Sequence, residues 1–387
     1  MKRLPLPRVD RQSGFTLIEL MVALAIGLLI VAALIALLLN LSRNNNELSK
    51  TNRMIENGRF AVQLLEGDLV HAGFWGGFVP RYDDLVNTDP PDDVPTAVPN
   101  PCTAFGVAWT DQYKSNLIGI PVHSYDVPAV PPAPPIPVCA GAGEPVQNPR
   151  GNSDVLVIRY AEKCTDDCLT VSPAVAGRLY FQAERCGDEL PATLAAAYRL
   201  DQTGFTLQTV ACNPAVLSDI RAFVSHIYFV RDVNGLPTLM RSRMDFAGGA
   251  VAHQPAEAMI EGIEAIRVEY GIDNLSDSGA AVNYATAVTW ADPENLVSPT
   301  NRGDGTPDAA YIRCTAAVPC TADQLMNAVA IKLHVLVRAD TATPGYVDNK
   351  TYNLGATTLG PFNDNFKRHV FTQTIRLTNV SSRRETP

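Results

Sequence analysis

A run of uncharged, mostly apolar residues near the start of the chain constrains the fold more than any other feature. No charged residue occurs from Leu20 to Leu39, and a helix of that length can cross a bilayer. Glu19 stands directly before this run. Because a carboxylate at the edge of a membrane segment is costly to bury, its position there indicates a function rather than chance.

The first 14 residues form a basic segment ahead of the apolar run. They contain four basic residues and one acid, a net charge of 4 − 1 = +3, which predicts that this end stays in the cytoplasm. A secretory signal would place small residues after its hydrophobic region. Here Ser13 and Gly14 come before it, so we expect the hydrophobic segment to be retained.

The junction Gly14-Phe15-Thr16-Leu17-Ile18-Glu19 resembles the class III signal of type IV prepilins and of type II secretion pseudopilins. The resemblance implies that a prepilin peptidase cuts between Gly14 and Phe15 and then N-methylates Phe15. It also implies that Glu19 meets the new positive amine of an adjoining subunit inside a filament, where a buried charge needs a partner. The alternative is that Glu19 lies at headgroup level and faces water.

Beyond the membrane segment, residues 41–72 are predicted to continue as an amphipathic helix. Apolar residues recur every seven positions, and Leu65 adds to the same stripe; the recurring residues are Leu41, Leu48, Ile55, Val62 and Leu69. The stripe is narrow, which favours packing on the chain's own head over a coiled-coil dimer. Asn44-Asn45-Asn46 and Gly58 are weak points where this helix could bend.

A proline-rich tract follows at about residues 80–150. It holds 15 of the chain's 29 prolines, including the segment PAVPPAPPIP. This composition predicts an extended surface excursion that is poor in regular structure and is tied down by Cys102 and Cys139. A proline-motif ligand for a partner protein is the alternative.

From residue 153 onward the pattern changes to β-strands. Strands are predicted where β-branched and aromatic residues gather, at residues 154–160, 178–183, 225–231, 237–243, 263–270, 328–338 and 371–377. The Asn234-Gly235 pair suits a tight hairpin turn between two of them. We therefore expect an α+β protein, with a long N-terminal hydrophobic helix packed on an elaborated antiparallel sheet in one compact head, residues 73–387.

Several segments from residue 58 onward resemble the PilW family of type IV pilus minor pilins. They are the GRFA segment at residues 58–61, LLEGDL at 64–69, HAGF at 71–74, SDVL at 153–156, EGIE at 261–264, YGID at 270–273 and the closing RHVF…RLTN at 368–379. The resemblance covers most of the chain but is weak between residues 80 and 150. It implies a type IV pilin-like fold without turnover chemistry. It also implies a place in the complex that primes pilus assembly and occupies the tip, for adhesion and twitching motility.

The same resemblance implies partners and location. The expected partners are the prepilin peptidase, other minor pilins, the major pilin and a PilY-type tip adhesin. The subunit would wait in the inner membrane with its head in the periplasm and then enter the pilus at the cell surface.

Eight cysteines occur, all after the hydrophobic segment, which predicts disulfides in an oxidising compartment. They are Cys102, Cys139, Cys164, Cys168, Cys186, Cys212, Cys314 and Cys320. Eight cysteines allow 105 pairings. Proximity favours Cys164 with Cys168, Cys314 with Cys320, and Cys186 with Cys212. Cys102 and Cys139 would then close a loop. Zinc is the rival reading, but no CxxC pair occurs.

Charge and motifs exclude several functions. A net charge of −9 without a basic block argues against nucleic acid as the main partner. Neither HExxH, GxSxG nor a Walker loop occurs, and we expect neither an enzyme nor a cofactor. His226 and His334 fall within predicted strands, which favours structural roles. Oxygen ligands for Ca²⁺ are an alternative reading of two loops, with Asp273, Asn274, Asp277, Asn301, Asp304 and Asp308, although turn formation is favoured.

Two rival functions remain open. The first is a minor pseudopilin of a type II secretion system, which uses the same kind of N-terminal signal. The size of the head argues against it. The second is a membrane-anchored periplasmic enzyme or binding protein that never enters a filament.

Overall fold

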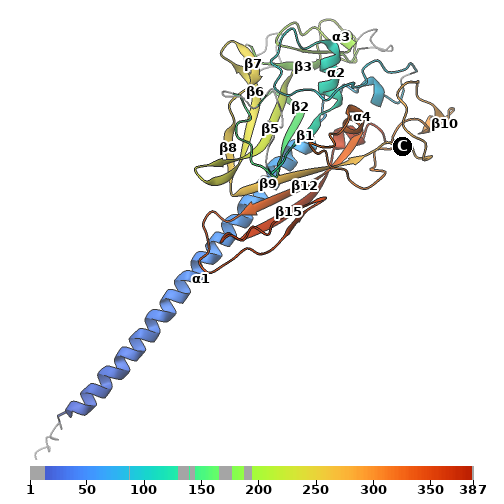
Figure 1. Ribbon diagram of the computed structural model, residues 1–387. Coiled ribbons are helices and arrows are strands. Elements are labelled where there is room, and N and C mark those ends of the chain that lie inside the picture. Colours follow the sequence, from blue (N-terminus) through green and yellow to red (C-terminus); the bar gives the residue numbers. More distant parts are fainter. Residues whose placement is uncertain are drawn as a thin grey trace, which may run out of the picture. The chain divides into compact units, whose positions relative to one another are not determined.

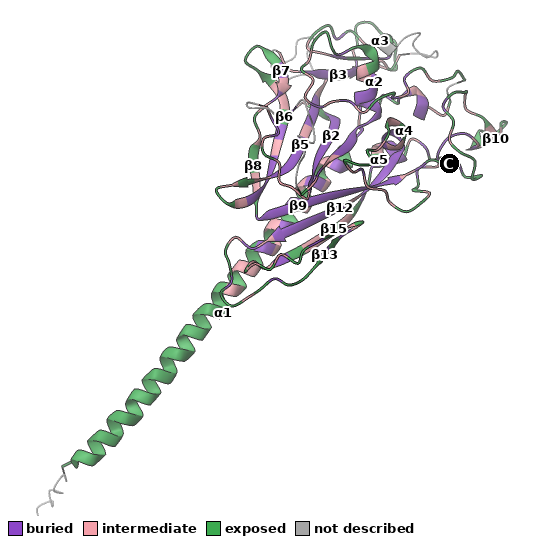
Figure 2. Cartoon of the chain, in the orientation of Figure 1, coloured by how far each residue is buried: buried purple, intermediate pink, exposed green. Residues whose placement is uncertain are grey.

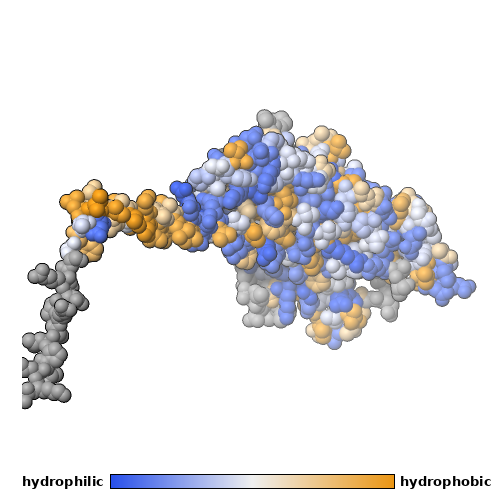
Figure 3. All heavy atoms as spheres, turned by 90° about the horizontal axis from the view of Figure 1, so that it is seen from below, coloured by the Kyte–Doolittle hydropathy of each residue, from blue (hydrophilic) through white to orange (hydrophobic). Residues whose placement is uncertain are grey.

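The computed structural model (Figure 1) describes residues 14–86, 88–129, 139, 144–164, 177–186 and 194–385. Its first helix, α1 (Leu17–His71), is 55 residues long and is the one helix in this described part that is long and apolar enough to cross a membrane. The chain divides into two compact units, Met1–Asn52 and Arg53–Pro387. In the first unit, residues 14–46 are all exposed, and Figure 3 shows the apolar side chains that surround this part of α1.

The second unit is built on antiparallel sheets. The largest is eight-stranded, with β1-β2-β5-β3-β4 in order and β6 joining β5 to β7 and β8. Its strands are β1 (Val122–Val127), β2 (Ser153–Lys163), β3 (Tyr180–Ala183), β4 (Tyr198–Asp201), β5 (Arg221–Val233), β6 (Leu236–Ala247), β7 (Ala250–His253) and β8 (Glu257–Glu261). A three-stranded sheet has the order β15-β12-β9, with β9 (Ile263–Ile272), β12 (Ala328–Arg338) and β15 (Arg368–Arg376).

Short elements complete this unit. Two small hairpins pair β10 (Trp290–Asp292) with β11 (Val297–Pro299) and β13 (Tyr352–Leu354) with β14 (Thr357–Leu359). The short helices are η1 (Arg81–Asp83), α2 (Asp111–Gly119), α3 (Leu194–Ala197), α4 (Ala322–Met326) and α5 (Thr378–Ser381). The expected α+β architecture, a long apolar helix with an antiparallel sheet head, is therefore confirmed.

The strand predictions succeeded where the local pattern was strong. The β5–β6 hairpin turns at Asn234 and Gly235, which both have positive φ, 52° and 81°. Two such residues form the turn type that matches the twist of a hairpin. The strands predicted from residues 154, 263 and 328 onward are β2, β9 and β12, each within a few residues of the expected bounds.

The C-terminal part of α1 packs in the second unit through only part of the predicted stripe, at Leu65 and Leu69. Its buried residues are Met54, Gly58, Ala61, Leu65 and Leu69 (Figure 2), whereas Ile55 and Val62 are half-buried and Leu48 is exposed. Gly58 does not bend the helix. A Cβ at this position would lie 2.1 Å from Cε2 of Phe371, so the glycine lets a β15 ring approach the helix backbone. The prediction was incomplete because it followed large apolar residues alone, whereas the closest packing here also uses the small residues Gly58 and Ala61.

The prediction for the proline-rich tract was right about the Cys102–Cys139 disulfide but wrong about regular structure and burial. Between residues 80 and 150 the structure contains α2 and β1, and Tyr82, Ile120 and Val122 lie in the main hydrophobic core. No proline occurs between Pro101 and Pro121, which leaves room for a helix. Thr110 caps that helix by accepting a hydrogen bond from the Tyr113 N–H. The PAVPPAPPIP segment itself lies almost wholly outside the described residues.

A buried ionic cluster joins β2 of the large sheet to β9 of the small one. Asp154 is 1% exposed and accepts hydrogen bonds from the side chains of Arg267 (2.6 Å) and Arg313 (2.7 Å). Asp126 accepts from the same two arginines. Buried charges are tolerated when paired and hydrogen-bonded in this way, so the cluster fixes how the two sheets meet.

Candidate functional site: the N-terminal segment

The predicted cleavage junction lies just before α1. Gly14 and Phe15 are outside any helix or strand, and Phe15 is 90% exposed. Non-helical, exposed backbone is the kind of segment that a peptidase can bind in extended form. The position of the cut remains a prediction.

Glu19 closes the first turn of the helix on its own subunit. Its Oε2 accepts hydrogen bonds from the backbone N–H of Thr16 (2.9 Å) and from the Thr16 hydroxyl (2.8 Å). The Glu19 N–H lies 3.4 Å from the Thr16 Oγ1. These reciprocal contacts form a capping box, which satisfies donors that the first turn leaves unpaired.

The sequence itself carries a signal for this cap. Thr16 is followed by Glu19 three positions later and then by a long apolar run, which is the pattern of a capping box. Both side-chain contacts use the Oε2 of Glu19, and within the described part of the chain the Oε1 accepts no hydrogen bond. One oxygen of the carboxylate therefore holds the helix start while the other can accept from an outside donor.

The structure contains three of the four expected disulfides among its described residues. Their Cα–Cα distances are 5.5, 4.6 and 5.0 Å, for Cys102–Cys139, Cys186–Cys212 and Cys314–Cys320 respectively. Cys164 is also disulfide-bonded, and Cys168 lies outside the described residues. The seven cysteines in the described part of the chain are therefore all in disulfides and are not available to bind zinc.

The residues considered for Ca²⁺ serve the loops instead. Both oxygens of Asp273 accept backbone N–H groups, from Asp304 at 3.1 Å and from Gly305 at 2.9 Å. Asp308 accepts the N–H groups of Asn274 and Leu275. Across the described ranges, no cluster of three or more His, Cys, Asp or Glu residues is placed to hold a metal. The remaining candidates hydrogen-bond to neighbouring loop residues, Asn301 to Thr286 and Asp277 to Ser298.

The two strand histidines both have hydrogen-bond partners, as expected for structural roles. His226 Nδ1 lies 2.6 Å from Asp68 Oδ2 on α1, and Tyr160 and Tyr228 donate to the same carboxylate. His334 bonds to Thr372 and approaches Glu269, and burial lowers the pKa of His334. Sequence reasoning did not identify Asp68, because its partners lie 92 to 160 residues away.

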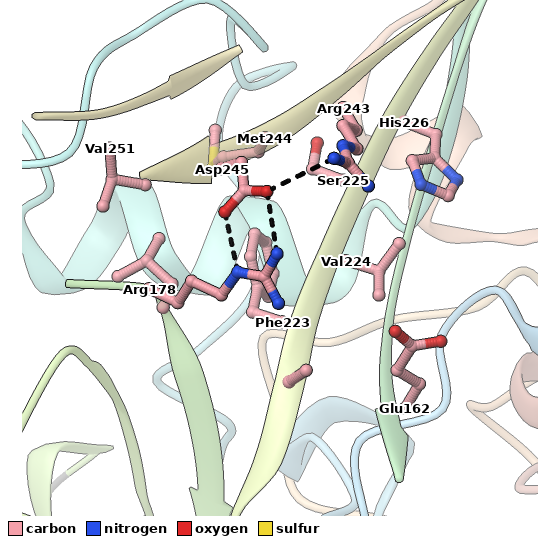
Figure 4. Close-up of a pocket in the computed structure, with 12 residues that line it drawn as sticks. Glu162, Arg178, Phe223, Val224, Ser225, His226, Arg243, Met244, Asp245 and Val251 are labelled. Carbon is pink, nitrogen blue, oxygen red and sulfur yellow. Dashed lines mark hydrogen bonds and ion pairs between the residues drawn. The ribbon is translucent and has the colours of Figure 1, made fainter. Parts of the chain in front are cut away.

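A pocket of about 120 Å³ opens between β5 and β6. Figure 4 shows the Asp245 carboxylate between Arg178 and Arg243. The pair with Arg178 is bidentate, at 2.8 and 3.0 Å, and Arg243 is 3.8 Å away. The Asp245 carboxylate neutralises much of the positive charge in the pocket, which leaves little to attract an anion. The arrangement is therefore suited to holding β6 against the loop before β3.

Ser225, on the pocket wall, contacts a histidine that is a poor base. The Ser225 Oγ is 3.0 Å from His253 Nε2, and the His253 Nδ1 is 3.2 Å from the Ser242 Oγ. Burial lowers the pKa of His253 to about 3. A base this weak cannot accept a serine proton efficiently near neutral pH, so the triplet is suited to satisfying buried polar atoms.

Comparison with known proteins identifies two regions of the chain. Residues 10–35 match the prokaryotic N-terminal methylation motif, and residues 227–379 match PilW, the type IV pilus-assembly protein W. A solved type IV-like pilin from Thermus thermophilus matches with 14% identity and a TM-score of 0.23, over 60% of this chain and 82% of that chain. No curated protein matches the chain.

The methylation motif spans the capped start of α1, and the PilW match runs from β5 to α5. The resemblance inferred from the sequence is therefore confirmed: residues 227–379 match the PilW family of the type IV pilus, and residues 10–35 match a prepilin methylation motif.

Proposed function

We propose that this chain is a structural minor pilin of the type IV pilus, processed between Gly14 and Phe15. One observation carries the proposal. The methylation motif coincides with an exposed junction, an intrasubunit helix cap and an uninterrupted apolar helix. A membrane anchor alone needs the apolar helix but not an acid at its first turn.

The cap explains how Glu19 can serve before and after processing. Cleavage creates a positive amine at Phe15, and packing that amine among apolar helices requires a counter-charge. Glu19 is held by Thr16 through Oε2, so its orientation is fixed before assembly. The Oε1 then accepts the amine of a neighbouring subunit, which sets the axial register of the filament.

The PilW resemblance supports a role at the tip, in the complex that primes assembly. The subunit would rest in the inner membrane with its head in the periplasm, and contact other minor pilins, the major pilin and a PilY-type tip adhesin. Adhesion and twitching motility follow from pilus assembly, without turnover chemistry in this head. Buried arginines of the head form ion pairs with buried aspartates, and these structural roles support a head without turnover chemistry.

The decisive variant is Glu19→Ala, with Glu19→Asp as the matched control. A filament subunit loses incorporation into sheared pili in the Ala variant, while its amount in the membrane stays equal to wild type. The Asp variant retains a charge and keeps part of the incorporation. Wild-type amounts of Glu19→Ala protein in sheared pili would instead support an anchored periplasmic protein that never enters a filament.

A further inference from the structure

The small β15-β12-β9 sheet has two edge strands, β9 and β15, whose outward backbone groups have different environments (Figure 1). The β9 edge is closed. Its outward N–H groups donate to the Ser153 hydroxyl (Ile266, 3.1 Å), to the Asp154 carboxylate (Val268, 2.9 Å) and to the Ile312 carbonyl (Tyr270, 2.7 Å). No further strand can pair there without displacing these contacts.

The opposite edge, on β15, is open. The Leu377 N–H donates to the Val329 carbonyl, and the Ala339 N–H donates to the Lys367 carbonyl. The backbone N–H and C=O groups of odd-numbered β15 residues therefore point toward β12. The backbone groups of Val370, Thr372 and Thr374 therefore point outward. In the described part of the chain no backbone or side-chain group bonds to these outward amides and carbonyls.

Natural proteins protect such an edge with charges, proline, bulges or a covering segment. Between Arg368 and Arg376 the strand has no charged residue and no proline, and its register with β12 runs without a bulge. Thr372 and Thr374 are exposed. The edge therefore has the features of a template for strand addition.

Neighbouring helix residues specify the side chains that an added strand would carry. Phe371 lies against Gly58 of α1, and Gln373 bonds to Glu66. Ile55 lies about one helical turn before Gly58 on α1, and Val62 lies about one turn after it, on the same side of the helix. Both residues are only half-buried. A strand with apolar residues at alternate positions would cover them, while its other face would meet the exposed threonines.

These same contacts argue against a second copy of the chain as the occupant. From Gly58–Phe371 to Glu66–Gln373, α1 and β15 advance in the same direction. Two copies paired antiparallel through β15 would be related by a twofold axis perpendicular to the sheet, so their α1 helices would run in opposite directions. Two anchors with basic N-terminal flanks do not insert oppositely in one membrane.

We propose that the β15 edge receives an extended segment of a different polypeptide, added as an uncharged strand with alternating apolar side chains. That this polypeptide is another subunit of the same pilus rests on the proposed function. Main-chain pairing would give affinity, and Ile55 and Val62 would select for apolar side chains.

Thr374→Pro tests the edge without disturbing the sheet, because the N–H that it removes points outward. Thr374→Ser is the matched control that keeps this N–H. The full-length Pro variant should melt like the Ser variant and carry the same mature N-terminus. Its amount in sheared pili should fall at least about tenfold, as expected when two or three main-chain hydrogen bonds and their neighbouring contacts are lost. Equal amounts of the two variants in pili would overturn the proposal.

Photo-crosslinking identifies the occupant. With p-benzoylphenylalanine in place of Thr374, irradiated cells should yield one adduct, mapped by mass spectrometry to an alternating segment of another pilus subunit. An adduct with a second copy of this chain, or none, would overturn the proposal. If wild-type protein is absent from pili altogether, the proposed function fails, while the crosslink still reports separately on the edge.

Discussion

The two parts of α1 solve opposite problems within one helix. Residues 14–46 are exposed, and most of them from Leu20 to Leu39 are large and apolar. The residues buried toward the other end include Gly58 and Ala61. A helix with its partner in the same chain uses small residues for close approach. One that presents large apolar residues all round requires a bilayer or neighbouring helices.

The largest expected effect concerns the buried ion pairs of the second unit, into which the C-terminal part of α1 packs. The Arg368 side chain is 1% exposed and contacts Glu264 and Asp348, which are buried as well. Arg368→Met leaves two buried acids without their main cation, and should lower the free energy of unfolding by about 3–5 kcal/mol. Arg376→Met, on the same strand, removes only a half-exposed pair with Glu385 and should cost about 0–1 kcal/mol. Urea unfolding of full-length protein in detergent measures both; equal losses would contradict the proposed difference.

Glycine substitutions in α1 sharpen the comparison directly. Gly58→Ala places a methyl group against the Phe371 ring and should destabilise the second unit by about 1–3 kcal/mol. Gly67→Ala is the matched control, because nothing lies within 4 Å of its Cβ position, and it should stabilise the helix by up to about 1 kcal/mol. Thermal melts of the two variants should shift in opposite directions. A shift of the same sign in both would mean that Gly58 does not mediate close packing.

The stability of the second unit should depend on pH because it contains a buried acid, Asp93. Burial raises the pKa of Asp93 to about 6, although it accepts the N–H groups of Arg81 and Tyr82. A raised carboxyl pKa means that the protonated form favours folding, so this contribution is full below pH 3.8 and is lost as the pH rises through 6. Wild type should therefore gain roughly 1–1.5 kcal/mol relative to Asp93→Asn between pH 7 and pH 5. Parallel stability curves over that range would show that Asp93 is not perturbed.

The smallest effect belongs to the exposed start of the helix. Thr16→Ala removes the hydroxyl that shares the capping box with Glu19 and should destabilise the first turn by about 0.5–1 kcal/mol. Faster hydrogen exchange at the amides of the first turn would report it, and Thr16→Ser should restore protection. If exchange is unchanged in Thr16→Ala, the cap does not hold Glu19 in place.

Sequence patterns predicted those features that depend on neighbouring residues. Strands β2, β9 and β12, the Asn234-Gly235 turn and the prepilin motif all follow from local spacing. The capping box was equally local and could have been predicted from Thr16 and Glu19. Burial of the proline-rich tract could not, because it depends on which strands cover α2 and β1.

Hydrogen bonds and ion pairs between residues far apart in the chain could not be predicted from the sequence, because they depend on the fold. Nothing near Asp68 indicates that it accepts from His226 and Tyr228, and nothing near Arg368 indicates Glu264, 104 residues away. The open edge of β15 is also invisible in the sequence, because it depends on the order of strands in the sheet. A buried Asp or Arg is expected to need a partner, but which residue becomes that partner depends on the fold.

The mature N-terminus shows whether this chain is processed as a prepilin and enters the pilus. Mass spectrometry of this protein recovered from sheared pili should find a chain that begins at Phe15 and carries one methyl group on its amine. An uncleaved leader, a cut after the apolar run, or absence of the protein from pili would contradict the account.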